Sequence, residues 1–342
     1  MTTRSTNHDW LAQTVEAPLE PDLPICDPHH HLWDLQPGRV APRYLLDEIL
    51  ADVGAGHNVV STVFIECGAM FKTDGPEALR PVGETEFVNG VAAMSASGLY
   101  GKARVAAGII GTADLRLGDA VADVLDAQMV AGGSRFRGIR RAGAWDAAPT
   151  VPSHRTQPGP GLFLRDDFRA GFAQLPPRRL TFEAWCYHRQ ISDVTALARA
   201  FPATTIILNH FGGPLGVGPY AGRADEVYAQ WRTSIGELAT CPNVVVKLGG
   251  INMEMNGFGW HERSRPPGSQ ELAEATRRYY EFTIEKFGVD RCMFESNFPV
   301  DKASCSYTVL WNSFKRLTSK YSAAEKAALF HDTATRVYRL LP

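Results

Sequence analysis

The chain has 342 residues, of which 44% are hydrophobic, and its formal net charge is −2. This charge gives no electrostatic basis for binding nucleic acid or an anionic membrane, so we expect neither as a partner. No apolar run approaches the ~20 residues that a membrane-spanning helix needs. The six cysteines are scattered and form no CxxC pair, which favours reduced thiols in a cytoplasmic protein.

The predicted elements begin with a polar, Pro-rich stretch at residues 1–24, which we expect to form an N-terminal arm. Residues 25–342 are expected to form a single domain in which β-branched runs alternate with helical spacing. Several of the runs, such as VVSTVFI, are almost continuously apolar, as expected for strands covered on both faces. Eight strands are predicted: Pro24–His29, Val59–Glu66, Ala103–Ile110, Phe136–Arg140, Leu180–Tyr187, Thr204–His210, Asn243–Leu248 and Cys292–Asn297.

Segments with helical spacing lie between these strands, and two more, at Ser304–Leu317 and Ala323–Leu340, follow the last one. The alternation predicts a parallel sheet, and eight units fit a closed (β/α)₈ barrel, with a doubly wound open sheet as the alternative. In such a barrel the active site lies at the carboxyl ends of the strands. Two long segments, 141–164 and 251–270, follow strands and are expected to cover that end as binding loops.

Histidines are concentrated at these predicted strand ends. In the stretch CDPHHHLW, His29 and His31 are two residues apart and face the same side of an extended chain, whereas His30 faces the other. His188 and His210 end the fifth and sixth runs. Each histidine alone could be a local hydrogen-bonding group in a turn. Four of them at the ends of three strands favour a shared metal site with His29, His31, His188 and His210 as ligands.

Several motifs in the same order resemble the amidohydrolase superfamily, and within it the amidohydrolase-related, lactonase-like TIM-barrel hydrolases. These motifs are DxHxHLW at 27–33, FRGIR at 136–140, NHFGGP at 209–214, VKLGG at 246–250 and MFESNFPVDK at 293–302. The resemblance implies a distorted (β/α)₈ barrel that hydrolyses lactones, esters or amides, although some relatives decarboxylate aromatic acids. It also implies that His29 and His31 are the first-strand metal pair, and that His188 and His210 occupy the ligand positions of the fifth and sixth strands.

The last strand departs from the family pattern. Related sequences usually read Gly-Ser-Asp-Trp-Pro there, and the Asp takes a proton from the attacking water. This chain reads ESNFP at 295–299, and the amide of Asn297 cannot act as a base. Glu295 faces the same way as Asn297. Our hypothesis is that Glu295 supplies the carboxylate, as base or ligand, while Asn297 orients water or substrate. The alternative is a structural Glu295, paired with Lys247 or Arg140.

The predicted cofactor is one divalent metal ion, Zn²⁺. Loss of the last-strand Asp weakens this prediction and the fifth-strand histidine strengthens it, so catalysis without a metal remains open. Guanidinium groups bind carboxylates bidentately, and among the arginines near the fourth strand we favour Arg140 as a substrate clamp. The other predicted substrate contacts are Arg137, Lys247, Tyr187 and His261, and each has a structural role as its alternative.

The predicted function is hydrolysis of a lactone or related cyclic ester, derived from a carboxylated aromatic or sugar catabolite. The predicted catalytic residues are Glu295, Asn297 and His210. One alternative is a metal-dependent decarboxylase of an aromatic acid, and another is a non-catalytic ligand-binding barrel. The expected partner is a small molecule, and a homodimer is a further expectation.

Overall fold

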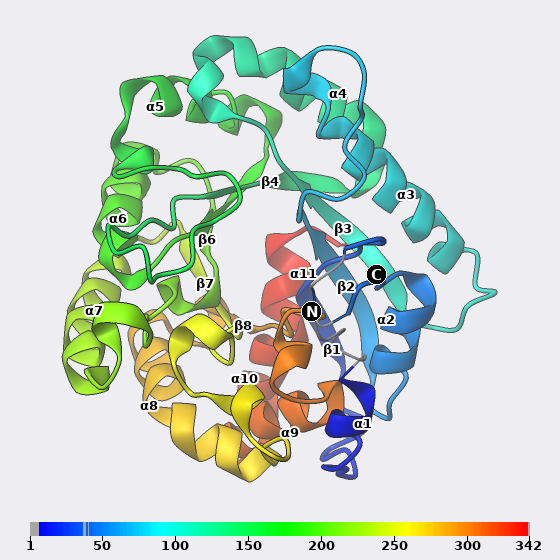
Figure 1. Cartoon of the computed structure of the whole chain (residues 1–342). Helices are drawn as coiled ribbons and strands as arrows, with labels where there is room; N and C mark the ends of the chain where they lie inside the picture. Colours follow the sequence, from blue (N-terminus) through cyan, green and yellow to red (C-terminus); the bar gives the residue numbers. More distant parts are fainter. Residues whose placement is uncertain (1–6, 37–38, 40, 341–342) are drawn as a thin grey trace.

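The computed structural model describes residues 7–36, 39 and 41–340, so the first six residues of the predicted arm lie outside the described part. Its eight strands are all parallel and pair in chain order (Figure 1). They are β1 (Ile25–His30), β2 (Val59–Ile65), β3 (Arg104–Gly111), β4 (Phe136–Ala142), β5 (Thr181–Trp185), β6 (Ile206–Leu208), β7 (Val244–Leu248) and β8 (Cys292–Phe294). Each predicted strand is therefore present, with bounds that differ by a few residues.

The sheet closes between β1 and the segment that follows β8. The backbone N–H of Asn297 donates to the carbonyl of His29 at 3.0 Å, and the N–H of His31 donates to the carbonyl of Phe298 at 2.8 Å. A further bond runs from the N–H of Ser296 to Asp27 Oδ1 at 2.9 Å. The fold is thus a single-domain, distorted (β/α)₈ TIM barrel, which excludes the open-sheet alternative.

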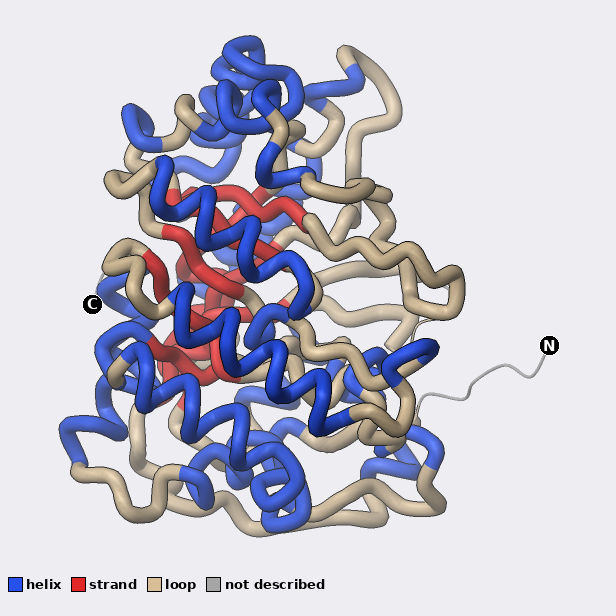
Figure 2. The backbone as a smooth tube through the Cα atoms, turned by 90° about the vertical axis from the view of Figure 1, so that its left-hand side faces the viewer, coloured by secondary structure: helices blue, strands red, loops and turns tan. Residues whose placement is uncertain are grey.

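Helices surround the strands (Figure 2). After a short α1 (His8–Leu11), the outer layer is formed by α2 (Leu46–Val53), α3 (Val82–Ala96), α4 (Val121–Gly132), α5 (Asp166–Phe172), α6 (Ile191–Ala200), α7 (Ala224–Leu238) and α8 (Ser269–Phe287). The chain ends with α9 (Tyr307–Leu317), α10 (Ala323–Ala327) and α11 (Thr333–Val337), with a π-helical turn between the last two. This turn divides the helical segment that the sequence predicts as continuous.

The C-terminal segment plugs the barrel at the amino ends of the strands. Inward-facing side chains pack in one cluster with residues of α11 and those that follow it: Cys26, Val63, Ile65, Ile110, Ile207, Val245 and Met293 against Ala334, Val337, Tyr338 and Leu340. Burial of this apolar surface removes water from one end of the barrel. The histidines of the predicted site lie at the opposite end, where the strands terminate.

The N-terminal stretch lies against α9. Asn312 Oδ1 accepts a hydrogen bond from the N–H of Leu19 at 2.7 Å, and Lys315 Nζ donates to the carbonyl of Leu19 at 2.8 Å. All six cysteines are free and buried, as predicted. Across residues 7–36, 39 and 41–340, no helix has both the length and the apolar character needed to cross a bilayer.

Candidate active site

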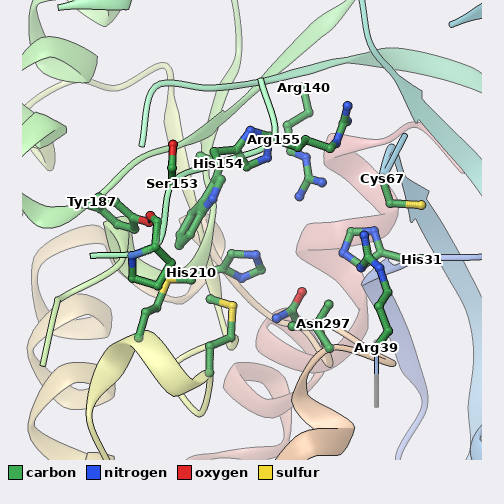
Figure 3. A pocket seen from close by; sticks show the side chains of 15 residues that line it. His31, Arg39, Cys67, Arg140, Ser153, His154, Arg155, Tyr187, His210 and Asn297 are labelled. Atoms are coloured by element: carbon green, nitrogen blue, oxygen red, sulfur yellow. The ribbon is translucent and has the colours of Figure 1, made fainter. Parts of the chain in front are cut away.

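A cavity of about 280 Å³ opens at the carboxyl ends of the strands (Figure 3). Both long segments contribute to it, one through residues 152–155 and the other through Met253 and Met255. Their predicted position over the barrel mouth is therefore confirmed. The lining residues are His31, Arg39, Cys67, Arg140, Pro152, Ser153, His154, Arg155, Trp185, Tyr187, His210, Met253, Met255, Asn297 and Val300.

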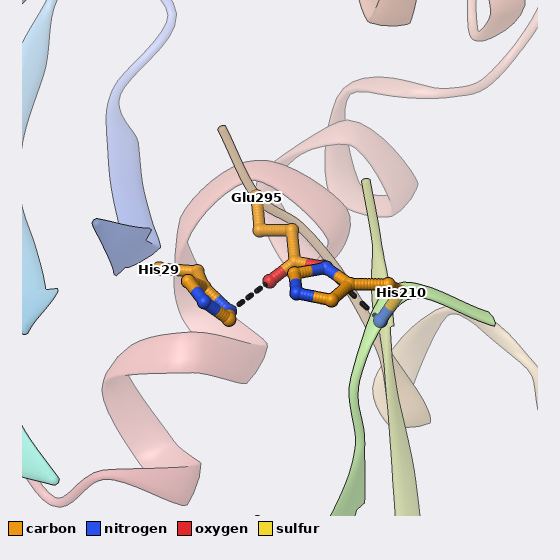
Figure 4. A group of neighbouring side chains, drawn as sticks. All are labelled: His29, His210 and Glu295. Carbon is orange, nitrogen blue, oxygen red and sulfur yellow. Dashed lines mark hydrogen bonds and ion pairs between the residues drawn. The ribbon is translucent and has the colours of Figure 1, made fainter. Parts of the chain in front are cut away.

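Two histidines and a glutamate meet next to this cavity (Figure 4). Glu295 lies between them: its Oε2 is 2.6 Å from His29 Nδ1 and its Oε1 is 2.7 Å from His210 Nδ1. The two imidazole rings are 4.5 Å apart, and all three side chains are buried. His210 also lines the cavity, whereas Glu295 and His29 lie behind it. The expectation that a structural Glu295 would pair with Lys247 or Arg140 is wrong, because its carboxylate contacts the two imidazoles.

Burial sets the protonation of this group. It raises the pKa of Glu295 to about 8, although Lys247 lowers that pKa. Burial also lowers the pKa values of His29 and His210 well below their usual range, and the neighbouring cations lower them further. Both imidazoles are therefore neutral near pH 7, which is the form that binds a metal or accepts a proton.

Unusual backbone geometry positions the group. His210 has φ 52° and Asn297 has φ 56°, both in the left-handed region that non-glycine residues rarely adopt. Two glycines of the VKLGG motif make room for the group. A Cβ atom on Gly250 would lie 2.2 Å from His210 Nδ1, and one on Gly249 would lie 2.2 Å from the carbonyl oxygen of Glu295. These two glycines, which directly follow β7, thus allow the backbone to approach His210 and Glu295 closely.

His31 lies beside this group rather than in it. Its ring is 5.0 Å from that of His29, at 85° to it, and lines the cavity. Its Nδ1 is 2.8 Å from the carbonyl oxygen of Ile65. Because a carbonyl can only accept a hydrogen bond, Nδ1 carries the proton and Nε2 is left with its lone pair. His30 faces the opposite side, as predicted, and packs on Phe64.

His188 is not brought to the other histidines. It was expected directly at a strand end, but β5 ends at Trp185, and His188 begins the next 3₁₀ turn. Its Nδ1 accepts a bond from the N–H of Leu215 at 3.4 Å, and its ring packs on Tyr220. Its Nε2 is buried and has no hydrogen-bond partner within residues 7–36, 39 and 41–340. The predicted convergence of four histidines is therefore wrong for this one.

Guanidinium groups supply the positive charge of the cavity. Arg140 Nε donates to Glu66 Oε1 at 2.9 Å, and Arg140 Nη1 is 3.3 Å from His29 Nε2. Arg155 pairs with the other oxygen of Glu66. Burial raises the pKa of Glu66, but the two arginines outweigh it and hold that pKa at about 2. Arg39 lies over the ring of Trp33 at 4.1 Å. Sequence reasoning missed Arg39 and Arg155 because both lie on loops.

The other predicted substrate contacts have different outcomes. Tyr187 lines the cavity, and its hydroxyl donates to the carbonyl of Pro152 at 2.5 Å. Lys247 points inward but donates to Glu183 Oε2 at 2.8 Å, and its Nζ is 3.4 Å from His29 Nδ1. His261 lies on the turn Trp260–Glu262 and is not among the lining residues.

Arg137 was expected at the mouth of the barrel, and the structure corrects this. It is the second residue of β4 and lies at the amino end of the strand. Its guanidinium donates to the backbone carbonyls of Tyr338 and Arg339, in the C-terminal segment that plugs the barrel. Arg137 therefore faces away from the cavity.

The described residues fit a divalent cation at His29, His210 and Glu295. Their ligand atoms all lie within 4.8 Å of one another, and two imidazoles with one carboxylate form a donor set that Zn²⁺ prefers. Glu295 Oε2 is buried and lies 2.6 Å from His29 Nδ1, but it accepts no hydrogen bond from the described residues. Because the His29 imidazole is neutral, a metal ion would supply the positive partner that this oxygen lacks. Lys247 Nζ lies 3.4 Å from His29 Nδ1, so its positive charge would compete with a metal ion at this place.

Comparison with known proteins identifies the family of the chain. Residues 26–340 match the family model described as Amidohydrolase. An uncharacterised protein, y4mH, of Sinorhizobium fredii is 34% identical over 93% of this chain and 99% of its own length. An L-fucono-1,5-lactonase of Burkholderia multivorans is 27% identical over 92% of this chain and 95% of its own. A crystal structure of an amidohydrolase from the same species, with bound zinc, has a TM-score of 0.69 at 25% identity and covers 93% of this chain and 99% of its own. The chain belongs to the amidohydrolase family.

Proposed function

We propose that the protein is a hydrolase that opens a lactone or related cyclic ester of a carboxylated small molecule. The observation that carries the proposal is the buried group of His29, His210 and Glu295 beside a cavity lined by guanidiniums. The lactonase from Burkholderia multivorans supports the reaction class, since it matches almost the whole chain.

The proposed cofactor is one Zn²⁺ ion held by His29, His210 and Glu295. A divalent ion at this place supplies Lewis acidity, which polarises a carbonyl and lowers the pKa of water. Glu295 then acts as a ligand, which is one of the two roles in our hypothesis for it. The zinc-bound amidohydrolase structure supports the choice of metal.

The cavity-lining residues take the remaining roles. His31 presents an unprotonated Nε2, so it is placed to accept a proton from water. Asn297 donates from Nδ2 to Asp301 Oδ1 at 2.9 Å, which leaves its own Oδ1 as an acceptor for water or a substrate hydroxyl. Both roles act on groups inside the cavity, where the substrate carbonyl would lie.

The charge of the cavity selects the substrate class. Three arginines line it, at 39, 140 and 155, and none of the described aspartates or glutamates does. Glu66, behind them, pairs with two of the arginines and can neutralise only one unit of their charge. The excess positive charge favours a substrate with a carboxylate, and Arg140 remains our proposed clamp together with Arg155.

The test measures metal content and reaction products separately. The purified protein should hold about one zinc ion per chain, and His29→Asn should lose it. His188→Asn is the matched control, since His188 lies outside the group and should keep the metal. A panel of lactones with and without a carboxylate, followed by acid release, should identify turnover that a chelator abolishes.

Each negative outcome has a defined meaning. Full turnover in protein that contains no metal would refute the proposed cofactor. The base would then be His210, held in place by Glu295. Release of CO₂ from an aromatic acid, with no acid release from any lactone, would assign decarboxylation instead. Zinc binding with no turnover of either kind would favour the non-catalytic, ligand-binding barrel.

A further inference from the structure

A second and larger cavity, of about 630 Å³, lies next to the candidate active site. It is lined by residues from 71–81, by Thr112, Ala113, Asp114 and Leu117 after β3, by Arg141, and by Arg155 and Thr156. Arg155 lines both cavities and is their common wall (Figure 3 shows its place in the first). Nothing in the proposed hydrolysis uses the second cavity.

Side chains alternate between the two faces of β4, so two adjacent arginines point into different cavities. Arg140 points into the barrel, so Arg141 points outward, toward the helical layer. Arg141 Nε is buried and has no hydrogen-bond acceptor in the part of the chain that the structure describes. Its Nη2 is 3.4 Å from Asp114 Oδ1, but that carboxylate is already bound by Arg116 through bonds of 2.9 and 2.6 Å. Arg141 thus shares its one counter-charge with Arg116, and its Nε has no acceptor among the described residues.

Arg80 also lines this cavity. Its Nε is also buried without an acceptor, and it makes no ion pair with any residue in the described part of the chain. The acids that line the cavity are Asp114 and Glu77, and Glu77 is exposed to solvent. Two guanidiniums therefore line one cavity: Arg80 has no counter-ion there among the described residues, and Arg141 shares Asp114 with Arg116.

The remaining wall is apolar. Phe71, Ala78, Pro81, Ala113 and Leu117 supply it. A guanidinium offers paired donors that match a carboxylate and a planar face that stacks on a ring. Apolar walls with a few polar groups are typical of small-molecule sites. An aromatic carboxylate satisfies both parts of this lining.

We propose that this second cavity is a binding site for an aromatic carboxylate, held by Arg80 and Arg141 and separated from the candidate active site by Arg155. The site is distinct from the catalytic group, and its existence does not depend on the hydrolase proposal. Its occupant supplies a counter-charge to the two guanidiniums and buries its ring against Phe71 and Leu117.

The test uses 4-bromobenzoate as the probe. In crystals of the full chain soaked with it, anomalous scattering from bromine should place the ring in the second cavity, with its carboxylate on Arg80 and Arg141. In solution, calorimetry should give a dissociation constant that rises on the order of tenfold in Arg141→Gln and in Arg80→Gln. Neutral 4-bromobenzamide should bind at least about tenfold more weakly than the carboxylate.

Two variants and a control keep the test decisive. Arg80 is only half-buried, so Arg80→Gln is expected to fold even if Arg141→Gln does not. Arg277→Gln, which removes an exposed arginine paired with Glu281 on α8, should leave binding unchanged. Bromine only in the first cavity, bromine in neither, equal binding of the carboxamide, or binding insensitive to both substitutions would each overturn the proposal.

Discussion

Replacing Gly250 by alanine should disable the site through a single added methyl group. The new Cβ would lie 2.2 Å from His210 Nδ1, whereas ordinary contacts begin at 3.4 Å. The imidazole must therefore retreat by about 1.2 Å, and a displacement of ~1 Å in a catalytic group can cost about 100-fold in rate. The residue also has φ +66°, which adds ~1–2 kcal/mol of strain for alanine. We expect kcat/KM to fall about 100-fold and zinc content to fall with it.

Alanine substitutions at two other glycines distinguish the displacement of His210 from the effect of backbone strain. Gly98 has φ +79° with nothing within 4 Å of its added Cβ, so Gly98→Ala should lose ~1–2 kcal/mol of stability but no activity. Gly236 lies inside α7, also in open space, and Gly236→Ala should stabilise the protein slightly. Activity and zinc content are measured in all three variants, with urea denaturation for stability. A Gly250→Ala protein as active and as metal-loaded as Gly98→Ala would refute the reasoning.

The remaining predictions concern the cavity wall. Glu66→Gln should destabilise the protein by ~3–5 kcal/mol, because Arg140 and Arg155 lose their shared counter-charge; urea denaturation at pH 7 measures this, and a loss below ~1 kcal/mol would contradict it. The pKa of Glu66 is lowered from 4.5 to about 2 in the folded protein, so its stabilisation is present above pH 4.5 and is lost as the pH falls toward 2. The wild type should therefore lose more stability than Glu66→Gln between pH 5 and pH 3, and parallel losses would contradict this. Tyr187→Phe removes the bond to Pro152 and should raise KM about threefold to tenfold with kcat little changed; steady-state kinetics with an unchanged KM would show that the bond does not hold the loop.

The strands could be predicted because their apolar, β-branched runs are continuous. The predicted positions of the strand ends were less accurate. The sixth strand was predicted as Thr204–His210 but pairs only over Ile206–Leu208, and the eighth ends at Phe294 rather than Asn297. In both cases the chain turns into the left-handed region just beyond the ladder, at His210 and Asn297. Hydrophobic pattern carries no signal for that turn.

Much of the candidate site followed from the rule that residues two apart in a strand face the same way. It placed His29 and His31 on one side of the chain, where their rings lie 5.0 Å apart, and it separated His30 from both. Applied to β4, the same rule puts Arg137 and Arg141 on the face opposite to Arg140, so it could have excluded Arg137 from the cavity.

The residues contributed by loops could not be found in this way. Arg155 reaches the cavity because Glu66 binds its guanidinium, and Gly68 leaves space for it: a Cβ there would lie 2.9 Å from the guanidinium carbon. Arg39 is held over Trp33. Both positions depend on partners that are distant in the chain or in loop conformations, and neither has a local pattern.

The hydrogen bonds between β1 and the segment after β8 also determine at which stage of folding the candidate site forms. His29 belongs to the first strand and Glu295 follows the last, so their contact spans most of the polypeptide. A nascent chain still missing its final strand has neither the carboxylate nor the backbone bonds that fix His29. The candidate site is therefore complete only once the ring has closed, so proposed turnover that returns during refolding would report ring closure.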